Sequence, residues 1–319
     1  MKILFITANR LGDAVLSTGI LGALIDRYPE ARITVACGIL PAPLFQSIPQ
    51  VVRVIPLIKQ ARHGHWFDLL RQTFATGWDL IVDLRNTAVS RLLRRRALRV
   101  FLGPKPRQHM VEGLAALIGA TPAQASPRLW LDPAAVEKVK HSLAATTQLL
   151  ALAPGAHGVG KRWPGDRYAA LAASLLAQGG PLAGAAVVLL GAPGEESTVR
   201  QTVEALDPEQ VINLVGRTEP AEAAAWLARA ALYVGNDSGL THLAAAAGIP
   251  TLALFGPGLP ARYRPWGKNA AYLIAKDDPA RTVDLCKIDD MLALKEMQKL
   301  TVDQVAATAK RLYQAGISL

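Results

Sequence analysis

The sequence predicts an α/β protein made of two rounds of parallel β-sheet. Short apolar runs rich in Val, Ile and Leu alternate along the chain with amphipathic or alanine-rich stretches of helical length. The alternation restarts near residue 148, after a looser stretch that contains Ser126-Pro127. A chain of 319 residues is also long enough for two domains. We therefore expect domains over residues 1–145 and 146–319, with a terminal helix that could pack back on the first domain.

Five apolar runs of the first round have the length and composition of buried strands. They are KILFIT, RITVACG, VVRVIPL, DLIVDLR and LRVFLG. Helices are expected between them, over residues 13–27, in WFDLLRQTFATG, in HMVEGLAALIGA and over residues 133–145.

The second round repeats the pattern and ends in the stretch LYVGNDSGLTHLAAAAGIPTLALFG. Strands are expected in LLALAPGA, AAVVLL and VINLVG, and helices in DRYAALAASLLAQGG, STVRQTVEAL and PAEAAAWLARA. In the last stretch a strand over residues 232–234 leads into a helix over residues 241–247, which Gly248 and Pro250 stop before a strand at residues 251–255. Ligands of parallel sheets bind at the carboxyl ends of strands, so we expect a site in a cleft between the two halves.

Composition narrows the class of protein. With 51% hydrophobic and 19% charged residues the chain is globular rather than disordered. No apolar stretch approaches the ~18 residues of a membrane span, and the N-terminus lacks the pattern of a signal peptide. Cys37 and Cys286 are too few for a disulfide framework or a four-cysteine metal site, and Asp289-Asp290 is expected to start a helix rather than to bind metal. These features favour the cytoplasm.

The net charge of +10 indicates an acidic partner, either an anionic membrane surface or a phosphorylated substrate. Nucleic acid is disfavoured, because only 6% of residues are aromatic and no basic motif is interleaved with them. Arginines cluster in SRLLRRRALRV. They could contribute to binding this acidic partner, or they could form a solvated helix face.

Polar residues follow most of the expected strands, and each has a functional and a structural interpretation. Asp237 stands where a strand turns into a helix, beside Ser238-Gly239, whose free backbone N–H groups could bind phosphate; Asp237 or Ser238 could equally be an N-cap. Asp13 could be a general base or a helix cap. Lys161, on a small-residue loop before Trp163-Pro164, could neutralise a diphosphate or simply be solvated.

Two further loops allow the same pair of interpretations. Glu195 in LLGAPGEE could accept hydrogen bonds from ribose hydroxyls, with Glu196 serving the helix start. Thr218 in NLVGRTEP could line a base pocket or cap the helix that begins near Pro220.

Taken together, these motifs resemble glycosyltransferase family 9, the ADP-heptose:lipopolysaccharide heptosyltransferases. The resemblance covers nearly the whole chain and rests on RLGD, PGA with KRWP, GAPGE, NLVGRT and above all GNDSGLTHLAAAAGIPTLALFGP. It implies the GT-B fold, two Rossmann-like domains with parallel sheets that face a central cleft. It also implies inverting transfer of heptose from ADP-heptose to the inner core of lipopolysaccharide, with no cofactor and no required metal.

The resemblance implies a role for each matching residue. Asp13 matches the proposed catalytic base, and Lys161 matches the lysine at the donor phosphate, which we also count as catalytic. The other donor-binding residues implied are Ala156, His157, Glu195, Thr218, Asp237, Ser238, Gly239 and His242. Ala156-His157 stands where some members carry paired threonines.

The expected acceptor is a phosphorylated glycolipid at the inner face of the inner membrane, to which the protein would bind peripherally. Basic residues of the N-terminal half are the candidates for holding it, namely Arg62, Arg85, Arg94 and Arg95. Two alternatives stay open: a relative that uses another nucleotide sugar or acceptor, and a nucleotide-binding relative without catalysis. Retention of both Asp13 and Lys161 argues against the second.

Overall fold

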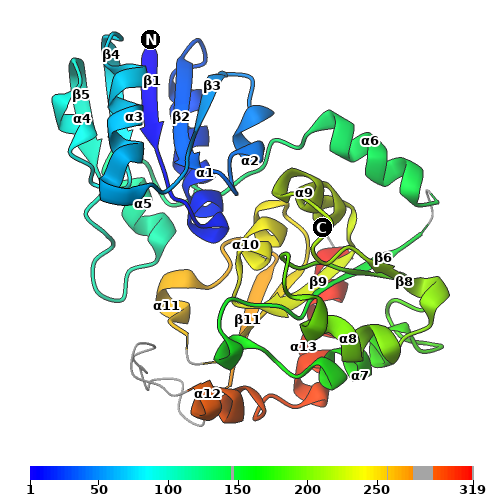
Figure 1. Cartoon of the computed structure of the whole chain (residues 1–319). Coiled ribbons are helices and arrows are strands. Elements are labelled where there is room, and N and C mark those ends of the chain that lie inside the picture. Colours follow the sequence, from blue (N-terminus) through cyan, green and yellow to red (C-terminus); the bar gives the residue numbers. More distant parts are fainter. Residues whose placement is uncertain (145–146, 257, 276–289, 318–319) are drawn as a thin grey trace. The chain divides into compact units, whose positions relative to one another are not determined.

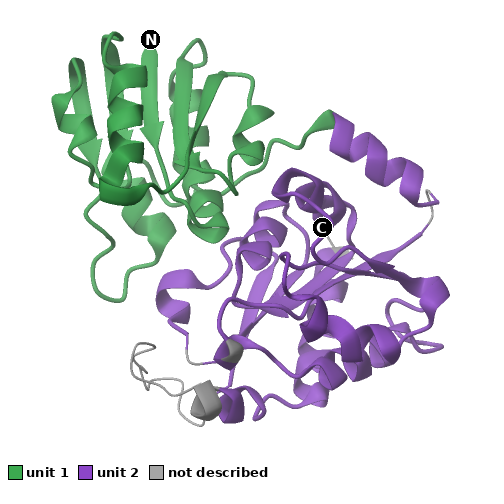
Figure 2. Cartoon of the chain, viewed as in Figure 1, with its two compact units in different colours: residues 1–133 green, residues 134–319 purple. Residues whose placement is uncertain are grey.

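The computed structural model describes residues 1–144, 147–256, 258–275 and 290–317 (Figure 1). The chain divides into two compact units, Met1–Pro133 and Ala134–Leu319 (Figure 2). Each unit has its own parallel sheet, which confirms the α/β class with two parallel sheets.

Unit 1 contains a five-stranded parallel sheet in the order β3-β2-β1-β4-β5. Apolar runs buried on both faces explain this sheet, because helices cover both sides. Its elements are β1 (Lys2–Ile6), α1 (Leu11–Arg27), β2 (Arg32–Gly38), α2 (Pro43–Gln46), β3 (Val51–Leu57), η1 (Ala61–His63), α3 (Gly64–Thr73), β4 (Trp78–Asp83), α4 (Val89–Leu92), β5 (Arg95–Val100) and α5 (Met110–Ile118).

The helices of unit 1 pack on its sheet in pairs. Helix α3 lies against α4 on one face, where Leu69 joins a buried cluster with Leu4 and Ile81 of the sheet. Helix α1 packs against α5 on the other side. The helices and the sheet of this unit can be followed in Figure 1.

Unit 2 contains a six-stranded parallel sheet in the order β11-β10-β9-β6-β7-β8. Its elements are α6 (Pro133–Ser142), β6 (Leu149–Ala153), η2 (Val159–Lys161), α7 (Gly165–Leu176), β7 (Ala186–Leu189), α8 (Glu196–Glu204), η3 (Pro208–Gln210), β8 (Val211–Asn213), α9 (Pro220–Arg229), β9 (Leu232–Asn236), α10 (Gly239–Ala246), β10 (Thr251–Phe255), α11 (Pro260–Tyr263), β11 (Ala270–Ile274), α12 (Asp290–Met297) and α13 (Val302–Ile317).

The main core of unit 2 lies between its sheet and helices α7, α8 and α13. Trp163 and Tyr168 are fully buried there and meet edge to face at 5.0 Å between ring centroids. Helices α9 and α10 pack against each other, and α10 also contacts β9 and β10. The terminal helix α13 packs on α7 and β10 within the same unit.

Two details differ from the expectations drawn from the sequence. The division between the units falls at Pro133 rather than at residue 145, and α6 is anchored in unit 2 by an ion pair of 2.8 Å between Lys138 and Glu222. The arginine-rich stretch is divided between two elements: Arg91 lies in the short α4, and the strand expected in LRVFLG begins earlier, at Arg95, so the alternative of a single helix face does not hold.

Part of the sequence analysis concerns residues that lie outside the described ones, namely Cys286 and Asp289. Cys37 is buried in β2, and burial raises the pKa of its thiol to about 12. None of the helices in the described residues is both long and apolar enough to cross a membrane.

Two glycines of α1 provide a test of how this helix packs. A Cβ added at Gly19 would overlap the backbone carbonyl of Ala125, which cannot move without shifting the chain. A Cβ added at Gly22 would meet only the side chain of Arg128, which can turn away. We expect Gly19→Ala to lower the free energy of unfolding by about 1–3 kcal/mol through overpacking.

The matched variant Gly22→Ala should change the free energy of unfolding by less than about 1 kcal/mol, because alanine's helix propensity offsets the displaced side chain. Urea unfolding followed by circular dichroism measures both variants. Equal stability of the two would contradict the close packing of α1 on residues 125–126.

Candidate active site

The strand order of each sheet marks where a ligand can bind. In unit 2 the chain proceeds from β6 outward to β7 and β8, then returns to β9 and continues the other way to β10 and β11. Strands β6 and β9 are therefore neighbours whose connections leave in opposite directions. Such a switch point leaves a crevice at the carboxyl ends of the two strands. The loops that follow β6 and β9 carry most of the residues predicted for the donor.

The side chain of Asn236, the last residue of β9, joins these two loops. It is fully buried, and its amide N–H donates to the Pro154 carbonyl at 2.7 Å. Its amide oxygen accepts from the Trp163 backbone N–H at 3.1 Å and from the Tyr168 hydroxyl at 3.0 Å. Burial holds the pKa of Tyr168 well above its usual range, so this hydroxyl stays a donor. Asn236 thus fastens both ends of the loop 154–163 to β9.

The position of this loop brings Lys161 to Asp237. The Lys161 ammonium donates to Asp237 Oδ2 at 2.5 Å, across 76 positions of sequence. The two side chains are 29% and 13% exposed, so the pair is partly shielded from water but open to a ligand. Asp237 is not the cap of the next helix, since Ser238 occupies that position. The ion pair concentrates charge at the switch point and holds the lysine ready for an anion.

The N-terminus of α10 stands directly beside this pair. Ser238 is its N-cap, but its side chain makes no capping bond. Among the described residues the buried Ser238 hydroxyl makes no hydrogen bond of standard geometry, although the Tyr233 hydroxyl lies beside it. Free N–H groups of the first turn, starting at Gly239, add partial positive charge in the same place. An anion could therefore accept hydrogen bonds from Ser238 and from the helix amides.

A buried hydroxyl network supports the first turn of α10. Thr241 donates to the Asn236 carbonyl at 2.6 Å, which leaves its oxygen to accept from Tyr233 at 3.0 Å. Burial raises the pKa of the Tyr233 hydroxyl above its usual range, so it remains a donor. His242 follows within the helix and is 6% exposed.

The carboxylate of Glu195 lies against the same loop from the β7 side. Its Oε2 accepts from the Ala192 backbone N–H at 2.9 Å, and it makes no capping bond to α8. Any side chain at Gly155 would collide with this carboxylate. The Glu196 carboxylate instead accepts from its own backbone N–H and from the Gly194 N–H, the latter at 3.2 Å, and these backbone hydrogen bonds lower the pKa of its carboxyl. Glu195 is the N-cap residue of α8, but its carboxylate packs on the loop, and Glu196 is the first residue of the helix.

The remaining predicted donor residues lie at the edges of this arrangement. Thr218 is half-buried in the loop after β8, and the cap of α9 is Glu219, so Thr218 is not the helix cap. Ala156 is buried, and its carbonyl accepts from Arg162 at 3.0 Å. The His157 side chain is exposed.

Unit 1 has a switch point of its own, between β1 and β4. Asp13 is half-buried in the first turn of α1, which begins at Leu11 after the N-cap Arg10, so Asp13 is not the cap. Across the switch, Arg85 after β4 donates to the Asn9 side chain at 2.7 Å. The carboxyl ends of β1 and β4 therefore bring a carboxylate and an arginine to the same edge of the sheet.

The loop after β4 is held by a fully buried acid. Asp83 accepts from the backbone N–H groups of Arg85 at 2.8 Å and Thr87 at 2.7 Å, and from the Thr87 hydroxyl at 2.8 Å. Arg85 also lies over the Trp66 ring, 5.5 Å from its centroid. These contacts fix Arg85 rather than leaving it as a solvated side chain.

The predicted acceptor arginines are divided between two edges of the unit 1 sheet. Arg62 lies after β3 at the carboxyl edge, and both Arg62 and His63 have left-handed backbone angles, φ 52° and φ 61°. Arg94 and Arg95 lie at the amino end of β5, because Arg95 pairs with Trp78, the first residue of β4. Since the strands are parallel, the structure brings Arg62 and Arg85 to the edge of Asp13 but places Arg94 and Arg95 at the opposite edge.

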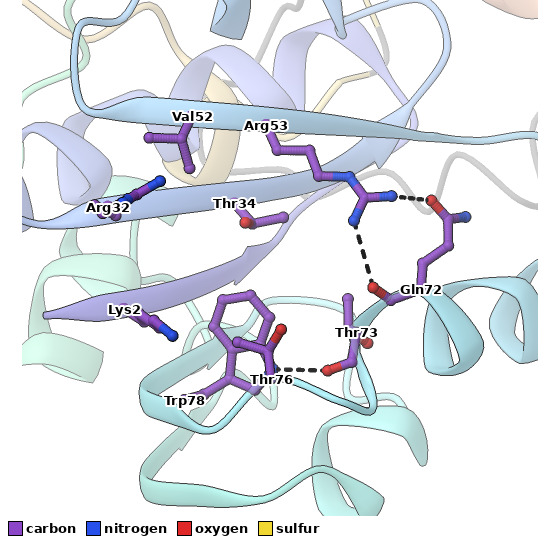
Figure 3. Close-up of a pocket in the computed structure, with 9 residues that line it drawn as sticks. All are labelled: Lys2, Arg32, Thr34, Val52, Arg53, Gln72, Thr73, Thr76 and Trp78. Carbon is purple, nitrogen blue, oxygen red and sulfur yellow. Dashed lines mark hydrogen bonds between the residues drawn. The ribbon is translucent and has the colours of Figure 1, made fainter.

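A basic pocket of about 370 Å³ also lies at the amino edge of this sheet (Figure 3). It is lined by Lys2, Arg32, Thr34, Val52, Arg53, Gln72, Thr73, Thr76 and Trp78. Arg53 is occupied with the end of α3, donating to the Gln72 side chain at 2.5 Å and to the Gln72 carbonyl at 3.4 Å. Because parallel sheets bind ligands at their carboxyl ends, this pocket is distinct from the switch-point site.

Comparison with known proteins identifies the family. The sequence pattern of glycosyltransferase family 9 (heptosyltransferase) matches residues 68–290. Lipopolysaccharide heptosyltransferase 2 of Salmonella typhimurium is 30% identical over 299 residues, which cover 82% of this chain and 84% of the relative. The chain belongs to glycosyltransferase family 9.

Solved structures agree with this membership. The structure of the E. coli ADP-heptose lipopolysaccharide heptosyltransferase II matches with a TM-score of 0.75 and 25% identity, covering 99% of both chains. An E. coli heptosyltransferase solved with ADP matches with a TM-score of 0.74 and 20% identity, covering 98% of this chain and 100% of the other. The fold of this family 9 enzyme is therefore GT-B.

Three residues that shape the loops at the two switch points have no functional interpretation from the sequence. From the sequence Asn236 only breaks the apolar run 232–234, whereas in the structure it ends β9 as a buried hydrogen-bond junction. Asp83 likewise ends β4 as a buried hydrogen-bond acceptor. Gly155 carries no signal in the sequence, because its contact with Glu195 joins positions 40 residues apart.

The buried junction of this family 9 enzyme can be tested by removing the Asn236 amide. Asn236→Ala would leave the Pro154 carbonyl, the Trp163 N–H and the Tyr168 hydroxyl without their partner. We expect the free energy of unfolding to fall by about 3 kcal/mol or more, since each orphaned buried group costs roughly 1–3 kcal/mol.

The matched control is Asn269→Ala, which removes an amide that donates to the Gly248 carbonyl at 2.8 Å from a more exposed position. Its effect should stay below about 1 kcal/mol in the same urea titration. Similar losses in both variants would show that Asn236 is not the junction described.

Proposed function

We propose that this enzyme transfers heptose from ADP-heptose to the inner core of lipopolysaccharide, with inversion at the anomeric carbon. The observation that carries the proposal is the Lys161–Asp237 pair at the switch point of unit 2, beside the uncapped N-terminus of α10. This combination suits the diphosphate of a nucleotide sugar, and the family to which the chain belongs is the heptosyltransferases.

The donor diphosphate would lie at the start of α10. Its oxygens would accept hydrogen bonds from Ser238 and from the backbone N–H of Gly239, while the ammonium of Lys161 would neutralise its charge. Asp237 would keep the lysine in place and accept a hydrogen bond from a sugar hydroxyl, and His242 would donate to a phosphate oxygen. These contacts strengthen as ADP leaves with the electron pair of the broken sugar–phosphate bond, which stabilises the transition state.

The nucleoside would extend toward the carboxyl ends of β7 and β8. Glu195 is the residue suited to the ribose, because a carboxylate accepts hydrogen bonds from two neighbouring hydroxyls. Thr218 would lie at the adenine, and the loop residues Ala156 and His157 would border the donor. Support for this orientation comes from the contact between Glu195 and Gly155, which places the carboxylate next to the loop that carries Lys161.

Asp13 would be the general base. It would take the proton from an acceptor hydroxyl, whose oxygen forms the new bond to the anomeric carbon while the bond to the diphosphate breaks on the opposite face. Its position at a switch point and its exclusion from the cap position support this role. Arg62 and Arg85, at the same edge of the sheet, would hold a phosphorylated acceptor.

Arg94 and Arg95 lie too far along the strands to share that edge, so we assign them to an anionic membrane surface instead. The enzyme would then work peripherally at the inner face of the inner membrane, where its glycolipid acceptor is inserted.

A panel of nucleotide sugars incubated with the enzyme and lipopolysaccharide core acceptors tests the function directly. Release of ADP from ADP-heptose with heptose appearing on the core is the expected result. Turnover only with another nucleotide sugar or acceptor would favour a differently specific family 9 enzyme, and donor binding without any transfer would favour a non-catalytic relative.

The donor assignment predicts the behaviour of two single variants. Lys161→Ala and Glu195→Ala should each weaken ADP binding by roughly 10–100-fold, because each removes a hydrogen bond that involves a charged group. Isothermal calorimetry with ADP measures the change. The exposed residues Lys268 and Glu204 provide matched controls, and alanine at either should leave ADP affinity unaltered. Unchanged affinity in both test variants would reject the proposed donor site.

The catalytic assignment predicts a different signature for Asp13→Asn. Turnover should fall by ~10²–10⁴-fold, the usual contribution of a general base, while ADP affinity is preserved. Asp26→Asn is the matched control, because Asp26 is an exposed acid at the far end of the same helix. Near-parental turnover of Asp13→Asn would show that Asp13 is not the general base and that its carboxylate only interacts favourably with the dipole of α1.

A further inference from the structure

The outer side of α3 in unit 1 is apolar where a surface helix is normally polar. Leu69 and Thr73 face the sheet and are buried, as is His65 one turn earlier. Phe67 and Phe74 project the other way and are 69% and 58% exposed. They are seven positions apart, so they lie on one line along the helix. The most solvent-exposed line of α3 therefore carries two large aromatic side chains.

Basic side chains surround this line. Arg71 stands between the two phenylalanines and is exposed. The acid on the same helix, Asp68, accepts a hydrogen bond from Gln60 at 2.8 Å and points to the side of the line. Unit 1 as a whole carries 17 Lys and Arg against 8 Asp and Glu, so nine of the ten net positive charges belong to it.

Helix α4, which packs beside α3, extends the same pattern. Leu92 is 62% exposed, while Leu93 is buried against the sheet. Arg91 donates to the Thr87 carbonyl at 2.7 Å and the Asn86 side chain at 2.6 Å, and Arg95 donates to the carbonyls of Arg91 and Leu93. Because these partners are neutral, the hydrogen bonds do not cancel the positive charges.

We propose that this α3–α4 surface, made of Phe67, Arg71, Phe74, Arg91, Leu92 and Arg95, is where the protein docks on an anionic lipid bilayer. The three apolar side chains enter the boundary of the acyl chains, and the three guanidinium groups bind lipid phosphates. The inference deepens the proposed function and rests on it in one respect, namely that the acceptor is a membrane glycolipid.

Charge and geometry favour a bilayer as the occupant. Apolar side chains ringed by uncompensated arginines match a surface that offers phosphates above hydrocarbon, since arginine can extend to the headgroups while its stem stays apolar. Helix α3 also begins just after Arg62 and its N-cap His63, at the edge that carries Asp13. A bilayer bound along α3 would therefore lie near the edge of the sheet where the acceptor headgroup is expected to bind.

Vesicle cosedimentation without donor or acceptor tests the docking surface. The parent should bind vesicles of phosphatidylglycerol and phosphatidylcholine, and part of the binding should survive 1 M NaCl, where the Debye length is only ~3 Å. Phe67→Ser/Phe74→Ser should lower the partition coefficient by about 100-fold, roughly tenfold for each side chain withdrawn from the acyl region. Phe67→Leu/Phe74→Leu should restore most of it.

The matched control is Val52→Ser/Val136→Ser, which removes two exposed apolar side chains from β3 and α6 and should leave vesicle binding unchanged. As a second readout, the tryptophan of Phe67→Trp should be quenched by lipids brominated on the acyl chains, whereas that of Val136→Trp should not. Circular dichroism melts confirm that each variant is folded.

Three outcomes would overturn the inference. The first is unchanged vesicle binding by Phe67→Ser/Phe74→Ser, which would leave only charge as the attraction. The second is binding of the parent that vanishes entirely at 1 M NaCl. The third is conversion of a parental dimer to a monomer by the serine variant in light scattering, which would make the surface an interface between copies of the chain. None of these measurements involves ADP-heptose. The docking inference can therefore be rejected while the transfer activity is confirmed, and the transfer activity can be rejected while docking is confirmed.

Discussion

The buried amide of Asn236 is the interaction on which the unit 2 site depends. It hydrogen-bonds the start and the end of the loop 154–163 to strand β9, and it does so from a fully buried position. A buried amide with all these partners is rigid, because no water can replace a broken bond. Because Asn236 holds the loop in place, Lys161 on that loop lies within 2.5 Å of Asp237, which is distant in sequence.

The two units divide the chemistry by charge as well as by fold. Unit 2 is nearly neutral and concentrates its local charges at one switch point, where a lysine, an aspartate and a helix N-terminus meet. Unit 1 carries almost all of the net positive charge and shows aromatic side chains beside its arginines. A neutral domain for the nucleotide sugar and a basic one for an anionic acceptor is a division that suits the proposed reaction.

Several choices that the sequence left open were decided by helix boundaries. Asp13 and Thr218 could each have been an N-cap, but α1 begins two residues before Asp13 and the cap of α9 is Glu219. A shift of one or two residues at a helix start depends on how the preceding strand ends and packs, which local propensity does not determine. The strand expected in LRVFLG likewise begins earlier than expected, at Arg95, because Arg95 and Ala97 also pair with β4.

The sequence by itself determined the class of fold, the strands and the loops that carry polar residues, because hydrophobic period and turn residues are local signals. It also determined the family, through short motifs around Asp13, Lys161 and Asp237. Only the tertiary structure decided that Lys161 pairs with Asp237, that Glu195 packs on Gly155 and that Arg95 lies at the opposite edge from Arg85. These contacts depend on strand order and register, which join residues distant in sequence and leave no local pattern to read.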